Sequence, residues 1–196
     1  MDHSITDTIA YTIRKATLAP LLAAVMLIFL YAVQPGVFDS AADLFRQLFF
    51  LSLFPLLAYP IHPMIPVFRD KGRDGQRYLA IIFALIGYLL NSILNLCIGA
   101  SQELRLIGWV YFLSGVIMLI LNRLCGFRAS GHAAGVSAIV CLLVALGYQE
   151  TLIVSLPLLI LVCWASIVTK RHTLAQLGGG LLIPMALTAL ITALEC

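Results

Sequence analysis

The chain has 196 residues, of which 62% are hydrophobic and only 11% are charged. A soluble domain is about half apolar and about a quarter charged, so this composition could not cover a surface in water. The net charge of +3 is small and scattered, which argues against a nucleic-acid partner. We therefore expect an all-α integral membrane protein that forms a single domain over residues 1–196.

Seven apolar runs approach the length of about 20 residues that a helix needs to cross a bilayer. In chain order they are Thr17–Val33, Leu48–Phe68, Tyr78–Ala100, Leu104–Leu121, Ala133–Tyr148, Thr151–Val168 and Leu174–Leu194. The fifth run is short, and only Gln149 and Glu150 separate it from the sixth, which predicts a tight helical hairpin. The expected architecture is a polytopic transmembrane helical bundle with six or seven membrane-spanning segments.

The second run differs from the others because it contains Pro55, Pro60, Pro63 and Pro66. Proline removes a backbone donor and kinks a helix. This run is therefore expected to be kinked or broken near His62, and a re-entrant segment is the alternative. We interpret His62 as a hydrogen-bonded residue at the kink rather than as part of an entrance for a headgroup.

Within the apolar runs, one pair of asparagines and one run of glycines predict contacts between helices. Asn91 and Asn95 lie one turn apart and are expected to pair with another helix. The consecutive glycines Gly178–Gly180 are expected to allow a second helix to approach closely, or to permit a kink.

The basic residues indicate orientation, because cytoplasmic loops carry an excess of Lys and Arg. If the runs alternate across the membrane, every Lys and Arg except Arg46 and Arg105 lies on one side. That side is expected to be the cytoplasmic face of a bacterial or archaeal plasma membrane. The N-terminus would be inside and the C-terminus outside.

Two loops on this side combine histidine with arginine and small residues. They are residues 122–132, NRLCGFRASGH, and residues 166–176, SIVTKRHTLAQ, and each leads into an apolar run. The N-terminus of a helix attracts anions, and Gly131 would let a ligand approach the backbone. His132 and His172 are suited to proton and phosphoryl transfer. The alternative is that these are ordinary basic residues and histidines at a membrane interface.

The two loops resemble the second and third signature motifs of the type 2 phosphatidic acid phosphatase superfamily, whose members are membrane-bound lipid phosphatases. The second motif, Pro-Ser-Gly-His, stands here as Ala129-Ser130-Gly131-His132. The third motif is Ser-Arg, five residues, His, three residues and Asp, and its second half keeps its spacing in His172 and Gln176. Shorter, divergent members that carry His-Thr-x-x-Gln are similar. The resemblance places a catalytic half at about residues 105–194.

The resemblance implies a role for each of these residues. His172 would be the nucleophile that forms a phosphohistidine, and His132 would protonate the leaving group. The phosphate oxygens would be bound by Arg123, Arg128, Ser130, Gly131, Lys170 and Arg171. The family needs neither a metal ion nor a cofactor.

This chain departs from the family pattern at three places. Gln176 replaces the aspartate that orients the nucleophile; its oxygen can accept the ring N–H but cannot stabilise an imidazolium as a carboxylate does. Ser166 stands six residues before His172, where the family has arginine. The first motif, Lys-x6-Arg-Pro, is not present as such, and Arg123 and Arg128 are the candidates to replace it.

The expected function is hydrolysis of a lipid phosphate or polyprenyl diphosphate through a phosphohistidine intermediate. Two alternatives stay open: a lipid phosphotransferase of the same superfamily, and a non-catalytic membrane protein that binds lipid phosphate. The expected partner is a membrane lipid phosphate, and a homo-oligomer is also left open.

Overall fold

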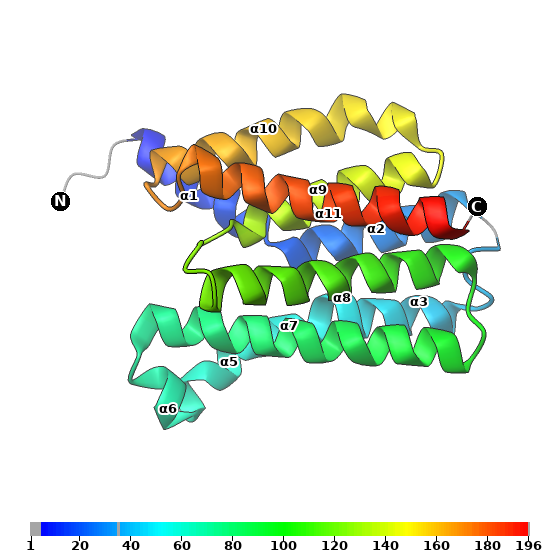
Figure 1. Cartoon of the computed structure of the whole chain (residues 1–196), viewed down its shortest axis with the longest axis horizontal. Coiled ribbons are helices and arrows are strands. Elements are labelled where there is room, and N and C mark those ends of the chain that lie inside the picture. Colours follow the sequence, from blue (N-terminus) through cyan, green and yellow to red (C-terminus); the bar gives the residue numbers. More distant parts are fainter. Residues whose placement is uncertain (1–4, 35, 196) are drawn as a thin grey trace. The chain divides into compact units, whose positions relative to one another are not determined.

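The computed structural model describes residues 5–34 and 36–195, and this part of the chain is helical and contains no strand (Figure 1). The prediction of an all-α protein is therefore confirmed. Within the described residues, five helical segments are long and apolar enough to cross a membrane. They are Ala41–Met64, Gly72–Cys97, Gln102–Arg123, Gln149–Val168 and Leu174–Leu194. These segments are compatible with a multi-pass membrane protein.

The two remaining predicted runs form shorter helices. Helix α2 (Ala19–Val33) follows α1 (Ile5–Ala16) at a bend of 54°, and the pair makes a sixth span if it is counted as one. The predicted run Ala133–Tyr148 forms α9 (Gly131–Ala145), which has 15 residues. At about 1.5 Å per residue, α9 is shorter than the hydrocarbon core of about 30 Å.

The proline-rich run forms a chain of short helices whose breaks follow the prolines. Helix α3 (Ala41–Leu48) leads into a π-helical turn at Phe49–Leu53, then α4 (Phe54–Leu56), α5 (Ala58–Ile61), a 3₁₀ turn at His62–Met64 and α6 (Pro66–Arg69). Pro55 has no N–H to give to the previous turn, and the wider π turn accommodates this loss. The chain is extended at Ile65, as expected for a residue that precedes proline.

The break predicted near His62 is thus confirmed. The Nε2–H of His62 donates to the carbonyl of Phe68 across the break, at 3.1 Å, as the interpretation of a hydrogen-bonded histidine requires. This span begins at Ala41 rather than at Leu48. The reason is that the charges of Asp43 and Arg46 form an ion pair, which lowers the cost of placing them in an apolar helix.

The chain divides into two compact units. We call Met1–Leu22 with Ile117–Cys196 the terminal unit, and Ala23–Val116 the middle unit. The terminal unit contains α1, α9, α10 (Leu152–Val168) and α11 (Leu174–Glu195). Both motif loops lie in this unit. The prediction of one domain over the whole chain stays a prediction.

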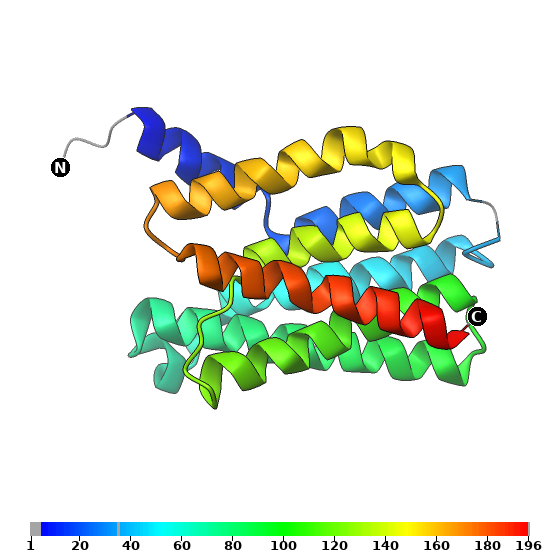
Figure 2. The same ribbon diagram turned by 45° about the horizontal axis from the view of Figure 1, so that its top comes forward.

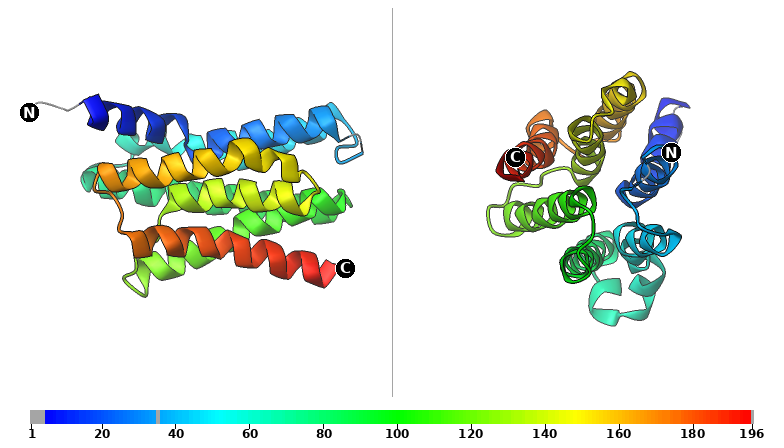
Figure 3. Two further views of the ribbon diagram at one scale, coloured as in Figure 1. Left: turned by 90° about the horizontal axis from the view of Figure 1, so that it is seen from above. Right: turned by 90° about the vertical axis from the view of Figure 1, so that its right-hand side faces the viewer.

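Helix α9 is the centre of the terminal unit. It turns back into α10 through Gln149–Thr151, which is the predicted tight hairpin (Figure 3), and α11 lies along α9 (Figure 2). Val136 and Val140 of α9 pack with Val162 of α10, and Ile13 of α1 packs against this apolar cluster. Apolar packing therefore helps to fix α1 to the unit.

Glycines set the distance between α9 and α11. A Cβ at Gly180 would lie 2.5 Å from the carbonyl oxygen of Ser130, and one at Gly179 would lie 2.6 Å from the Phe127 ring. Both distances are too short, so a larger side chain at Gly180 would push α11 away from the Ser130 backbone, and one at Gly179 would displace the Phe127 ring. The predicted close approach is confirmed at these two positions, whereas Gly178 faces open space.

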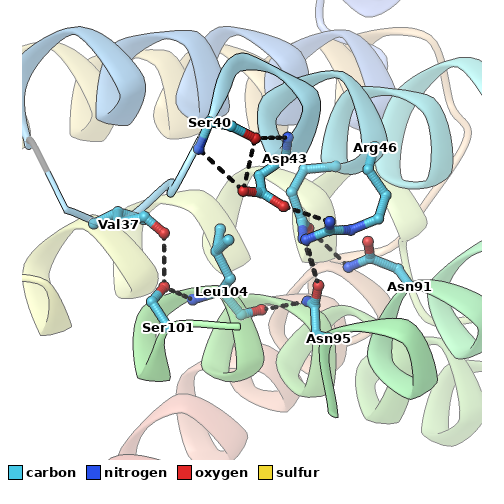
Figure 4. Close-up of polar contacts among 9 residues, drawn as sticks. Val37, Ser40, Asp43, Arg46, Asn91, Asn95, Ser101 and Leu104 are labelled. Atoms are coloured by element: carbon cyan, nitrogen blue, oxygen red, sulfur yellow. Dashed lines mark hydrogen bonds and ion pairs between the residues drawn. The ribbon is translucent and has the colours of Figure 1, made fainter. Parts of the chain in front are cut away.

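The middle unit contains a buried group of amides, Gln47, Asn91 and Asn95, which we call the amide cluster (Figure 4). Helix α7 (Gly72–Cys97) supplies both asparagines, and their bonds to Gln47 of α3 and to α8 confirm that they serve helix packing. Asn95 donates to the Leu104 carbonyl of α8 (Gln102–Arg123) at 2.9 Å. Gly108 of α8 faces the cluster, because a Cβ there would lie 3.4 Å from the side-chain nitrogens of both Asn91 and Asn95.

In the amide cluster each side-chain amide donates a hydrogen bond to the next, from Asn91 to Gln47 to Asn95. Asn91 donates to the Gln47 side chain at 2.8 Å, and Gln47 donates to Asn95 at 2.7 Å. Arg46 also donates to Asn95, at 3.3 Å, and is paired with Asp43. Asn95 thus makes three side-chain hydrogen bonds, whereas Asn91 makes one and its Oδ1 has no hydrogen-bond partner.

Candidate active site

Ser130 begins helix α9. Its backbone is extended and its hydroxyl accepts from the Ala133 N–H at 3.4 Å, which makes Ser130 the N-cap residue. The side chain is fully buried. Gly131, the next residue, is exposed, and apart from the adjoining residues and the backbone of its own helix no heavy atom lies within 4 Å of the position that a Cβ would take. The start of α9 is thus a capped helix end with an accessible backbone beside it.

A backbone contact brings the two motif loops together. The N–H of Ser130 donates to the carbonyl of Gln176, in the first turn of α11, at 2.9 Å. The absence of side chains at Gly179 and Gly180 makes this approach feasible. Ser130, from the second-motif-like segment, therefore lies beside Gln176, from the third.

Gln176 has two partners through one side-chain oxygen. It forms a reciprocal cap with Thr173: the Gln176 N–H donates to the Thr173 hydroxyl at 3.3 Å, and the Thr173 N–H donates to Gln176 Oε1 at 3.2 Å. The same Oε1 lies 3.3 Å from Nδ1 of His172. Because Oε1 can only accept, Nδ1 of His172 is the donor in this contact.

His132 contacts a different element. Its half-buried ring donates from Nε2 to the backbone carbonyl of Arg14, at the end of α1, at 3.0 Å. The Arg14 guanidinium in turn donates from Nη1 to the Ser166 hydroxyl at 2.7 Å, and Ser166 donates to the Val162 carbonyl at 2.8 Å. One residue of α1 therefore touches both motif loops.

The four other predicted basic residues are exposed: Arg123, Arg128, Lys170 and Arg171. Arg123 ends α8, Arg128 lies in the loop before α9, and the other two lie between α10 and α11. Lys170 has a positive φ of 50°, where α10 ends, and the next N–H, that of Arg171, donates to the Ser166 carbonyl at 3.0 Å. This is the geometry of a helix C-cap that usually takes glycine.

The predicted site residues therefore form two groups that adjoin at the first turn of α9. His172, Gln176 and Ser130 make up one group, and His132 belongs to the other, with Arg14 and Ser166. From the sequence, Arg14 was only one of the basic residues that predict orientation, and its place in this region was missed. No local signal could have found it, because its partners are more than 100 positions away along the chain.

Among residues 5–34 and 36–195, no group of three His, Cys, Asp or Glu side chains is placed to hold a metal ion. Comparisons with protein-family models, with curated proteins and with solved structures give no match for this chain. The resemblance to the type 2 phosphatidic acid phosphatases therefore rests on the residues of the two loops.

Proposed function

We propose that the protein is a membrane-embedded lipid phosphatase that works through a phosphohistidine on His172. The observation that carries this proposal is the bond between His172 Nδ1 and Gln176 Oε1. In a neutral imidazole this bond keeps the proton on Nδ1, which would leave on Nε2 the lone pair that a nucleophile needs. The adjacent start of α9, with Ser130 as its cap and Gly131 exposed, offers N–H groups for phosphate oxygens.

The proposed reaction has two steps. His172 Nε2 attacks phosphorus, the bond to the lipid oxygen breaks, and His132 gives that oxygen a proton. A water molecule, which returns a proton to His132, then attacks the phosphohistidine and releases phosphate. Because Nε2–H of His132 is bonded to the Arg14 carbonyl, the transferred proton would be the one on Nδ1.

The site is proposed to face the cytoplasm. The contacts of Arg14 with His132 and Ser166 support this placement, because they join three segments whose basic residues predict that side. Residues 1–4 at the N-terminus lie outside the described part. Cysteines introduced at the exposed positions Leu124 and Leu174 should be protected from an impermeant reagent in intact cells. Labelling from outside would reverse the orientation.

The function is tested with purified protein in detergent, EDTA and a panel that includes phosphatidic acid and polyprenyl diphosphates. We expect phosphate release from at least one of these lipids. His132→Ala should slow a substrate with a poor leaving group about 10²–10⁴-fold, and a good leaving group far less, because a general acid matters most for a basic leaving oxygen. Loss of activity in EDTA, or no release from any lipid, would refute the proposal.

One observation favours the non-catalytic alternative. Gln176 Oε1 already accepts the Thr173 N–H, so the residue has a structural role as part of a helix cap. It also brings no negative charge to His172. A protein that binds lipid phosphate without hydrolysing it would show saturable binding in the same panel but no phosphate release.

A further inference from the structure

We infer that Arg14 of α1 is a phosphate-binding residue of this site and occupies the place left by the missing arginine at position 166. The inference deepens the proposed function and rests on it. Its basis is the contact between the Arg14 guanidinium and the Ser166 hydroxyl, at 2.7 Å. Ser166 is fully buried and Arg14 is half-buried, so the charge lies at the residue where the third motif lacks one.

The second support is the bond from His132 to the Arg14 backbone carbonyl, at 3.0 Å. It fixes the end of α1 beside the first turn of α9, where Gly131 is exposed. A phosphate held at that turn would lie next to the helix end that carries the guanidinium. Arg14 therefore combines a charge with a fixed position relative to the proposed general acid.

Arg14 also differs from the other basic candidates in how it is held. Arg128 and Arg171 are exposed on loops, and Arg123 is exposed at the end of α8. Arg14 belongs to a helix whose neighbouring residue, Ile13, packs on the apolar cluster of α9 and α10. A positioned guanidinium loses less freedom when it binds an oxyanion than a mobile side chain does. Its five N–H donors in a planar fork allow it to keep Ser166 and bind phosphate oxygens as well.

The test compares Arg14→Ala and Arg14→Lys with Lys15→Ala as a matched control. Lys15 neighbours Arg14 on α1 and carries the same charge, but it is exposed and lies over the Tyr11 ring, 4.9 Å from its centre. Two quantities are measured: KM and kcat for the best lipid phosphate, and the rise in Tm caused by orthovanadate, a phosphate analogue. The second quantity does not depend on turnover.

For Arg14→Ala, we expect kcat/KM and vanadate affinity to fall together, by about 10- to 100-fold, the factor for losing a hydrogen bond to a charged group. Arg14→Lys should recover part of the affinity, because lysine keeps the charge but not the fork. Lys15→Ala should change both quantities less than about twofold, as expected for an exposed charge. If Arg14→Ala does not fold, the comparison rests on Arg14→Lys against the control.

The inference is overturned if the Arg14 variants bind vanadate as tightly as the wild type, whatever their stability. A merely structural role for Arg14 would lower Tm and leave the vanadate affinity unchanged. If the wild type releases no phosphate but binds vanadate through Arg14, the proposed function fails and the binding site stands. If it neither releases phosphate nor binds vanadate, both proposals fail.

Discussion

The two polar regions of this chain are built in opposite ways. The amide cluster of the middle unit is fully buried, and its side chains bond to one another, to Arg46 and to the Leu104 carbonyl. The motif region of the terminal unit is partly exposed, and its side chains bond mainly to backbone groups and helix caps. Buried amides in an apolar unit stabilise helix packing, whereas accessible helix ends with histidines and arginines can bind a ligand. Polarity inside an apolar chain therefore does not by itself indicate a site.

The largest expected effect is on turnover, at His172. His172→Ala should reduce phosphate release to the background rate, because no other side chain can form the covalent intermediate. The half-buried histidine of the other unit provides the control: His62→Ala loses one bond to the Phe68 carbonyl and should keep full activity per folded molecule. Phosphate release and Tm are measured for both variants. Full activity in the His172 variant would contradict the proposed mechanism.

The next effect is on stability, at the amide cluster. Hydrogen bonds between membrane helices contribute about 0.6 kcal/mol on average and up to about 1.7 kcal/mol. Asn95→Ala removes three bonds and should cost about 2 kcal/mol, whereas Asn91→Ala removes one and should cost about 0.6 kcal/mol by the same measure. Unfolding in mixed detergents measures both free energies. If both variants lost the same free energy of unfolding, the number of hydrogen bonds in the amide cluster would not be what stabilises the unit.

A smaller effect is expected where α10 ends. Lys170 has a positive φ, and a left-handed residue other than glycine costs about 1 kcal/mol. Lys170→Gly should therefore raise the free energy of unfolding by up to about 1 kcal/mol. Lys170→Ala is the control, since it removes the charge but keeps the strain. If Lys170 also binds phosphate, both variants should raise KM equally. KM then reports the lost charge, and the free energy of unfolding reports the relieved backbone strain.

The smallest effect on stability is expected at Gln176. Gln176→Glu keeps the length of the side chain and its cap with Thr173, and it adds a negative charge to the first turn of α11. Such a charge contributes about 0.3–1 kcal/mol at a helix N-terminus. It should also stabilise the His172 imidazolium, so activity should rise or the pH optimum should shift. A pH–rate profile identical to that of the wild type would mean that Gln176 serves only as a cap.

The sequence alone predicted the all-α class, the break near His62, the hairpin at Gln149 and Glu150, and the role of the asparagines in packing. These features follow from local causes: apolar length, proline's missing donor, and the cost of burying an unpaired amide. The resemblance of the third motif also implied that Gln176 is the partner of His172, in place of the family's aspartate.

Only the tertiary structure could decide which distant residues meet. It put the carbonyl and guanidinium of Arg14 beside His132 and Ser166, and it placed the N–H of Ser130 on the carbonyl of Gln176. It also showed that the proline-rich span begins at Ala41 rather than at Leu48, since Asp43 and Arg46 neutralise each other. Such contacts depend on how α1, α9, α10 and α11 pack, and small residues such as Gly179 and Gly180 set that packing through space. No periodicity along the chain encodes it.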